Sequence, residues 1–225
     1  CLRSPYTTMG IVFGVTGVEQ PAFKIIARST WNASAYEVRM RPACVAARVS
    51  TQIQSSEGNG KAFPILAGYI GVISAPKNDS NTSISMTAPV VQTPTTKIPA
   101  SVNMLSGTGY DNGEMSMAFL LPACYTTLEA CPKPMDERIE LSEEPECLIA
   151  VATFSGWCSE SVVKRHLQEL VASTAKDGLS TGTDWQLAQY NPPFTLPWFR
   201  TNEIWLPIKN SEEELLQVLE KVVKK

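Results

Sequence analysis

The sequence predicts an α+β domain built on a mostly antiparallel β-sheet. Two segments, residues 61–70 and residues 160–176, have the apolar spacing of amphipathic helices. Short apolar runs, several of which alternate with polar residues or end at Pro and Gly, lie before and after each segment. This order reads as ββ–α–ββ twice. We therefore expect two halves of similar build around one sheet.

Composition limits the kind of protein. The chain has 225 residues, 44% of them hydrophobic, which suits one domain with a sizeable core. A formal net charge of −3 argues against a nucleic-acid surface, which would need clustered basic residues. No run reaches the roughly 18 apolar residues typical of a transmembrane helix. The six cysteines lack metal-site spacing, and we expect reduced thiols.

Prolines mark the elements of the first half. Residues 36–49 alternate like a pair of strands, and Pro42 marks the turn between them. The first helix should begin near residues 60–63, because Pro64 is tolerated only in a first turn. Pro89 lies in an apolar run, which predicts an edge strand or a bulge. The other segments expected here are that strand at residues 84–93, a long connection at residues 94–116 and a strand at residues 117–122.

The second half is organised around the helix at residues 160–176. Ser159 is a suitable N-cap and Gly178 a suitable C-cap glycine. The apolar spacing predicts a buried face made of Val163, Leu167, Leu170, Val171 and Thr174. The strands expected around this helix lie at residues 138–141, 148–154, 186–190 and 203–208.

A third amphipathic helix is expected at residues 211–225. Ser211 and Glu214 have the spacing of a capping box. The helix either docks on its own domain or binds a protein partner. The chain therefore divides into a tail at residues 1–8, a domain at residues 9–208 and this helix within residues 209–225.

The stretch at residues 185–208 holds three of the five Trp and four of the sixteen Pro. Its segment YNPPFTLPWFRTNE resembles a signature of the SOUL haem-binding family. Further matches follow in the family's order: MGIVFGV at residues 9–15, YEVRMRP at 36–42, LAGYIG at 66–71, ISMTAPVV at 84–91, MAFLLP at 117–122, PMDERIEL at 134–141 and FSG at 154–156. The resemblance covers residues 9–208 and is greatest to the plant and algal branch.

The resemblance implies a distorted antiparallel β-barrel with two long helices outside it. It also implies non-catalytic binding of haem or another porphyrin, as a carrier or buffer, in a shallow apolar groove beside the first helix. By the GYIG match, the groove-lining positions are Phe63, Leu66, Ala67 and Ile70. Lys61 is the one basic residue on that helix, so apolar area must carry most of the affinity. Phe194 and Trp198 would form the other wall, with Arg200 beside them.

Residues able to ligate iron also have plainer readings. His166, the only histidine, serves as a haem ligand only if its imidazole faces a pocket, and a structural or solvated role is favoured. Met86 and Met117 are able to ligate iron, but core filling is favoured.

Two polar groups are also open to more than one reading. Arg200, Asn202 and Glu203 either bind a polar substituent or satisfy backbone groups near the prolines. An acidic cluster reads more readily as a solvated edge than as a calcium or glycosidase site. The cluster comprises Asp136, Glu137, Glu140, Glu143, Glu144 and Glu146.

No nucleophile–base pair or metal cluster stands out, so the sequence favours a binding protein over an enzyme. Two alternatives stay open: a ligand-free interaction or structural subunit, and a binder of another flat apolar molecule. If a transit peptide preceded Cys1, the plastid is the expected compartment, and otherwise the cytosol. The glycosylation sequons at Asn32, Asn78 and Asn81 read as chance matches in polar loops.

Overall fold

The computed structural model describes residues 11–29, 35–52, 57–94, 114–211, 213–215 and 217–218. Nine strands form one sheet in the order β1-β2-β7-β9-β8-β4-β5-β3-β6, and every pairing in it is antiparallel. The strands are β1 (Lys24–Ser29), β2 (Tyr36–Arg41), β3 (Cys44–Gln52), β4 (Val90–Pro94), β5 (Glu114–Leu120), β6 (Ile139–Glu144), β7 (Cys147–Phe154), β8 (Gln186–Gln189) and β9 (Asn202–Pro207). The predicted α+β class is confirmed.

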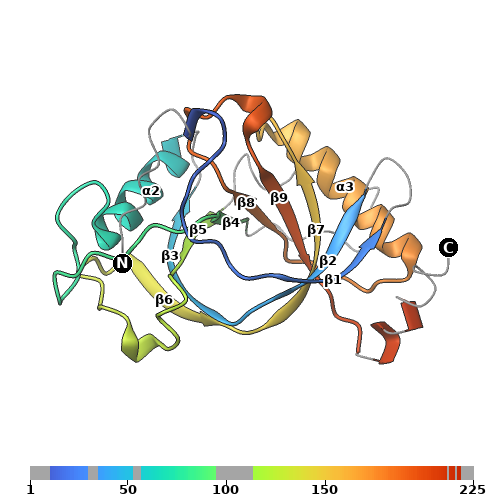
Figure 1. The fold of residues 1–225 in the computed structure, drawn as a ribbon, viewed down its shortest axis with the longest axis horizontal. Helices are drawn as coiled ribbons and strands as arrows, with labels where there is room; N and C mark the ends of the chain where they lie inside the picture. Colours follow the sequence, from blue (N-terminus) through green and yellow to red (C-terminus); the bar gives the residue numbers. More distant parts are fainter. Residues whose placement is uncertain are drawn as a thin grey trace.

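Two long helices cover the outer sides of this strongly curved sheet (Figure 1). Helix α2 (Glu57–Ile70) contacts β3 and β5, and helix α3 (Glu160–Asp177) contacts β7 and β9. Two 3-10 turns complete the described elements: η2 (Leu128–Ala130) and η3 (Pro197–Phe199). Among the described strands, β1 and β6 form the two ends of the sheet and do not pair with each other. The sheet formed by the described strands is therefore not closed, and the distorted barrel that the resemblance implied is not confirmed.

The two halves have the same element order. After β1, the chain runs β2-β3-α2-β4-β5 and then β6-β7-α3-β8-β9. The halves exchange their first strands, because β2 pairs with β7 and β6 pairs with β3. They meet where β4 pairs with β8. The predicted pair at residues 36–49 is thus wrong in one respect: β2 and β3 are both strands, but they do not pair with each other.

Side chains alternate between the two faces of the sheet and fill three apolar clusters. One cluster lies with α3 and includes Leu167, Leu170 and Ile204. A second lies with α2 and includes Leu66, Ile70 and Phe119. The third lies on the opposite face of the strands and is centred on Trp205, which is fully buried. The sheet thus has apolar packing on both faces, which explains why several strands lack a polar side.

Helix α3 forms as the sequence predicts. Its buried residues are the five expected ones, Val163, Leu167, Leu170, Val171 and Thr174. Gly178 ends the helix with a left-handed φ of 86°, and its N–H donates to the carbonyls of Ala175 and Thr174. Ser159 occupies the N-cap position, although its hydroxyl makes no capping hydrogen bond.

Proline positions account for two corrections. Helix α2 begins at Glu57, so Pro64 lies inside it and not in its first turn. Pro64 is exposed, so its ring causes no clash in the core, and burial of the opposite side of the helix outweighs one missing N–H. Pro89 follows a cis peptide bond and precedes β4, which is a central strand between β5 and β8 and not an edge strand.

Other expectations lie partly outside the described residues. The long connection expected at residues 94–116 is one of them, because residues 95–113 are not described. Its expected ends are wrong, since Pro94 belongs to β4 and β5 already begins at Glu114. The capping box is confirmed: Ser211 N–H donates to Glu214 Oε2 at 3.0 Å, and Glu214 N–H donates to Ser211 Oγ at 3.3 Å. Leu215 and Val218 are buried in the cluster beneath α3, so this part of the C-terminal segment docks on its own domain.

Candidate functional site

The proline-rich corner, residues 191–201, connects β8 to β9 and is held by inward-facing polar groups. Arg200 Nε donates to the carbonyl of Thr195 at 2.8 Å, and its Nη2 donates to the carbonyl of Pro193. Asn191 Oδ1 accepts from the N–H of Thr201 at 2.7 Å. Just beyond the corner, Asn202 donates to the carbonyl of Gly156 at 3.2 Å. Arg200 and Asn202 thus satisfy backbone groups, which is one of the two roles predicted for them.

The N-terminal segment at residues 11–15 crosses this corner. Leu196 N–H donates to the carbonyl of Val12 at 3.2 Å, and Asn191 Nδ2 donates to that of Gly14 at 3.0 Å. Gly14 has a φ of 86°, and a Cβ added there would lie 2.6 Å from the Phe199 carbonyl oxygen. Glycine is therefore required at this position by both backbone angle and space.

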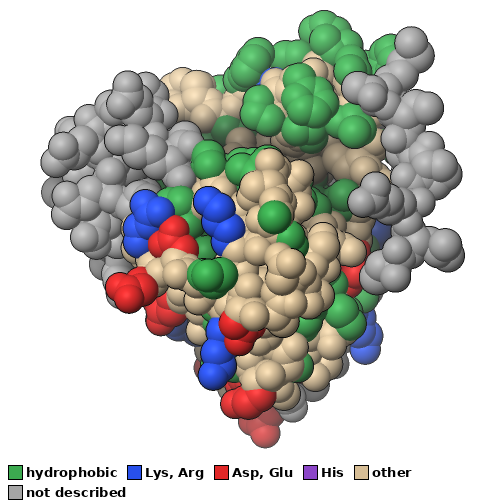
Figure 2. Space-filling model, turned by 90° about the vertical axis from the view of Figure 1, so that its left-hand side faces the viewer, with side chains coloured by type: hydrophobic (Ala, Val, Ile, Leu, Met, Phe, Trp, Pro, Cys, Tyr) green, Lys and Arg blue, Asp and Glu red, His purple; other side chains and the backbone are tan. Residues whose placement is uncertain are grey.

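Several large apolar side chains of these segments face outward. We call them the aromatic tip: Phe13, Val15, Trp157, Phe194, Trp198 and Phe199, with exposed fractions of 53, 49, 62, 60, 66 and 41%. The Phe13 and Phe199 rings lie 5.5 Å apart, and Trp198 and Phe199 lie 6.3 Å apart. The Arg200 guanidinium stacks 4.0 Å above the Trp157 ring. Figure 2 shows hydrophobic side chains gathered at the top of the molecule, above a recessed part of the surface.

The sheet register brings the corner and helix α2 to the same end of the sheet. Phe119 on β5 pairs with Val90, Val90 with Gln189, and Gln189 with Asn202. Phe63 of α2 contacts Phe119, with ring centroids 5.4 Å apart. Because two strand spacings separate Phe119 from Gln189, the corner begins roughly 10 Å from the strand beneath Phe63.

The predicted groove-lining residues divide into two groups. Leu66, Ala67 and Ile70 are at most 1% exposed and pack into the core beneath α2. The prediction that these three residues form an exposed groove wall is therefore wrong, because the apolar stripe of α2 faces the sheet. Phe63 is 36% exposed and can contact a ligand. Lys61 belongs to α2, but its side chain lies outside the described part of the structure.

His166 is engaged within its own helix and with the neighbouring strand. Its ring stacks on Phe154 at 4.4 Å, Nδ1 lies 3.3 Å from a Glu169 oxygen, and Nε2 lies 3.0 Å from an Arg165 nitrogen. Burial, followed by the Arg165 charge, lowers the pKa of His166 below its ordinary value. Both ring nitrogens have protein neighbours, which agrees with the structural role favoured from the sequence.

The two methionines and the acidic cluster also follow their plainer readings. Met117 is buried among the residues beneath α2, and the partly buried Met86 packs against the same cluster. Four residues of the acidic cluster are exposed, as expected of a solvated edge: Glu137, Glu140, Glu143 and Glu146. Glu144 differs, because it is half-buried and lies 2.6 Å from Arg48 and 3.6 Å from Arg41. No group of three acidic, His or Cys side chains able to hold a metal ion occurs among the residues that the structure describes.

The sequons and cysteines add no site within the described ranges. Asn78 is buried, and its side chain donates to the carbonyls of Tyr69 and Thr82, so it is a structural residue of its loop. Asn32 lies outside the described residues, whereas Asn81 lies in a turn with a φ of 50°. The five described cysteines are all free thiols, as expected.

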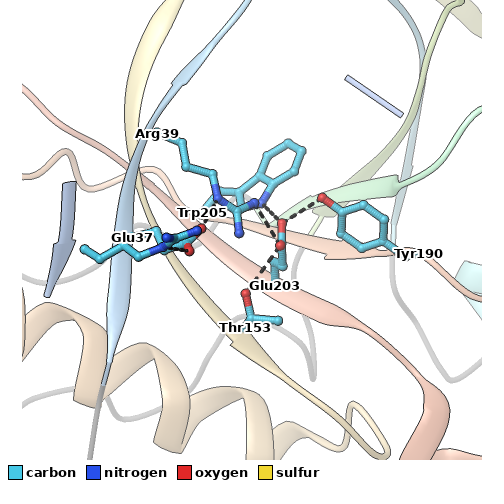
Figure 3. Close-up of polar contacts among 7 residues, drawn as sticks. Glu37, Arg39, Thr153, Tyr190, Glu203 and Trp205 are labelled. Atoms are coloured by element: carbon cyan, nitrogen blue, oxygen red, sulfur yellow. Dashed lines mark hydrogen bonds and ion pairs between the residues drawn. The ribbon is translucent and has the colours of Figure 1, made fainter. Parts of the chain in front are cut away.

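A buried polar network lies on the concave side of the sheet (Figure 3). Glu203 Oε1 accepts from Arg39 Nη1 at 2.9 Å and from Thr153 Oγ1 at 3.3 Å. Glu203 Oε2 accepts from Tyr190 Oη at 2.8 Å and from Trp205 Nε1 at 2.7 Å. The glutamate is buried, and its four donors come from β2, β7, β9 and the residue that follows β8.

Charge compensation explains how this network is stable in a buried position. Arg39 Nε also donates to Glu37 at 2.7 Å, and Glu37 accepts from Arg28 at 2.8 Å. Burial disfavours the charge on Arg39, but Glu203 and Glu37 outweigh it and raise the pKa of Arg39. Burial, and then the Glu203 charge, raise the pKa of Tyr190, so its hydroxyl stays a donor.

Sequence reasoning singled out Glu203 but missed its partners. Arg39 lies 164 residues earlier in the chain, and no local pattern connects the two. Both carboxylate oxygens are occupied by donors and the charge is paired, so Glu203 is not available as a general base. Its role is to tie β2, β7 and β9 to the residue that follows β8, beneath the corner.

The family model described as SOUL heme-binding protein matches residues 18–207. This match spans most of the chain, so the protein belongs to the SOUL heme-binding family. No curated protein matches the sequence. None of the described helices is long and apolar enough to cross a membrane.

Solved structures share the fold. The C-terminal domain of EcmrR is 10% identical, with a TM-score of 0.58 over 80% of this chain and 99% of that one. A hydrolase and an uncharacterized conserved protein, both from Listeria innocua, are each 13% identical over 77% of this chain and cover 91% and 92% of their own lengths. Their TM-scores are 0.51 and 0.53. At such identities the likeness shows the fold alone, and the hydrolase's activity does not transfer.

Proposed function

We propose that this protein binds haem or another porphyrin without catalysis, as a carrier or buffer, against the apolar surface between Phe63 and the proline-rich corner. The observation that carries the proposal is the exposure of Phe194 and Trp198 at the same end of the sheet as Phe63. A flat macrocycle needs such rings more than it needs hydrogen bonds. Membership of the heme-binding family supports this choice of ligand.

The described side chains fit the macrocycle better than they fit its iron. His166, Met86 and Met117 are engaged in stacking or core packing, so the binding mode that we propose does not use an axial ligand. Arg200 uses Nε and one Nη2 donor on backbone carbonyls, which leaves Nη1 for a carboxylate. Haem would supply an iron centre when bound; the chain's part is to hold and shield the ring.

The expected affinity follows from area. Three rings exposed to this extent offer about 300 Å² of apolar surface, and the ligand loses a similar area. At about 25 cal/mol per Å², this gives roughly 15 kcal/mol before the costs of association. Those costs take about half of the total, so a dissociation constant on the order of micromolar is expected.

The test is a titration with haemin and with metal-free protoporphyrin, followed by tryptophan fluorescence. Trp157 and Trp198 are exposed and should be quenched, whereas Trp185 and Trp205 are buried. We expect saturable one-to-one binding of both ligands. Phe63→Asp should weaken both by at least tenfold. The matched control is Ile73→Asp, which changes an exposed apolar residue just beyond the C-terminal end of α2.

Three outcomes would redirect the proposal. Binding of haemin alone, abolished in His166→Ala, would mean that iron ligation carries the affinity. Absence of saturable binding to either ligand would leave the interaction-subunit alternative, tested by a pull-down with and without residues 211–225. Competition by non-porphyrin aromatics would favour a broader apolar site. The compartment, plastid or cytosol, stays a prediction from the sequence.

A further inference from the structure

The aromatic tip is larger than an ordinary exposed patch. Its six side chains expose roughly half of their surface each, or about 700 Å² together. The largest apolar patch of a typical monomer is about 300–600 Å², and larger patches mark interaction sites. Three separate segments build this one, at residues 11–15, 154–157 and 194–199.

The fold holds these rings outward by turning polar atoms inward. Thr195 Oγ1 donates to the carbonyl of Ile11 at 2.8 Å, and Gly156 N–H donates to the carbonyl of Pro197 at 2.9 Å. The side chains of Arg200 and Asn191 also hydrogen-bond to backbone groups of this corner. The rings therefore sit on a braced scaffold, and little conformational entropy is lost when they contact another surface.

The chemistry of the tip suits a lipid surface. Residues 11–18, 154–159 and 191–202 contain no acidic residue, and Arg200 is their one charged side chain. Protein interfaces carry about one hydrogen bond per 100–200 Å², which the inward-turned polar groups of the tip do not offer. Trp and Phe rings partition to the boundary between headgroups and acyl chains, where a guanidinium can face phosphates.

We propose that the aromatic tip docks on the surface of a phospholipid bilayer. Trp157, Trp198 and the neighbouring Phe rings enter the interface, and Arg200 lies at the level of the phosphates. The tip's area is close to the about 800 Å² that a standard dimer interface buries on each partner, so area alone does not select the occupant. The polar groups argue against a second copy of this chain, because they are used within the fold and are not offered to a protein partner. The inference does not depend on tetrapyrrole binding.

The test uses the full, ligand-free chain and vesicles of phosphatidylcholine and phosphatidylglycerol. We expect co-sedimentation with the vesicles, a blue shift of tryptophan fluorescence and reduced quenching by acrylamide. Phe13→Ser combined with Trp157→Ser should lower the bound fraction at least tenfold. The control pair is Val72→Ser with Ile73→Ser, which removes two exposed apolar side chains outside the tip.

Three results would overturn the inference. They are no binding of the wild-type chain, an equal decrease for both variant pairs, and a concentration-dependent dimer that the tip pair abolishes without any vesicle binding. Protoporphyrin titration of the wild-type chain separates the two proposals, because that measurement does not depend on the tip substitutions. If the protein binds protoporphyrin but does not co-sediment with vesicles, only the lipid inference is wrong. If it co-sediments with vesicles but does not bind protoporphyrin, only the proposal of tetrapyrrole binding is wrong.

Discussion

Replacing Glu203 with Gln tests how much the buried network stabilises the domain. Glutamine keeps one side-chain oxygen and has an amide nitrogen in place of the other. This nitrogen faces either Arg39 and Thr153 or Tyr190 and Trp205, depending on which oxygen it replaces. Each pair contains a group that can only donate, the guanidinium or the indole. Either orientation therefore places two donors against each other and leaves the Arg39 charge less compensated.

The cost follows from the hydrogen bonds that the substitution breaks. One charge-assisted hydrogen bond contributes about 1.5–3 kcal/mol, and a buried donor left unsatisfied costs about 1–3 kcal/mol. We expect Glu203→Gln to lower the free energy of unfolding by about 3–5 kcal/mol, the range known for broken buried ion pairs. For a chain of this size, the melting temperature should fall by about 10 °C.

Urea unfolding followed by tryptophan fluorescence measures this effect. The midpoint should fall while the dependence on denaturant stays constant. Arg138→Gln is the control, because this exposed guanidinium lies 2.6 Å from the half-buried Asp136, and its loss should change the midpoint little. If Glu203→Gln unfolds at the wild-type midpoint, the view that charge pairing stabilises this site is wrong.

Three further predictions concern single positions. His166 is the only histidine, so NMR should show a single imidazole pKa, and it should lie below 6.5. Because the unfolded chain then binds protons more readily than the folded one, the free energy of unfolding should fall as the pH drops through 6.5. His166→Phe should remove this dependence of stability on pH. Gly14→Ala should lower the free energy of unfolding by about 1–2 kcal/mol and make the N-terminal segment sensitive to protease, because the methyl group meets Phe199; unaltered proteolysis would contradict this. Leu66→Ala should lower the free energy of unfolding in urea by about 2–5 kcal/mol, and Phe63→Ala should lower it clearly less. Small and equal effects of the two substitutions would instead support the prediction that Leu66 lies in an exposed groove wall.

Local patterns were most informative in α3. The spacing from Val163 to Thr174 and the glycine at residue 178 predicted both the buried face and the C-cap, because each depends on neighbours within one or two turns. Helix α2 shows the limit of the same reasoning. Its apolar stripe was recognised, but a stripe has the same pattern whether it covers a sheet or lines an open groove. Burial of Leu66 and Ile70 decided between these readings.

Strand partners were beyond local reasoning. Residues 36–49 contain two strands, as the alternation and Pro42 indicated, yet β2 pairs with β7 more than a hundred residues later. Pro89 suggested an edge strand because the sequence pattern put this proline inside a strand, where it would lack an N–H for pairing. In the structure it precedes β4, which is free to pair on both sides. Pairing depends on which strands meet in space, and no local rule contains that information.

The sequence by itself determined the family, the α+β class, the two helices and the aromatic composition of the corner. These properties depend on residue identity and on spacing along the chain. Only the tertiary structure decided which rings remain exposed, which helix residues are buried and which arginine neutralises Glu203. Exposure and charge compensation depend on the elements packed across the sheet: Arg39 reaches Glu203 from 164 residues away, and Phe194 and Trp198 stay exposed because the corner's polar groups turn inward.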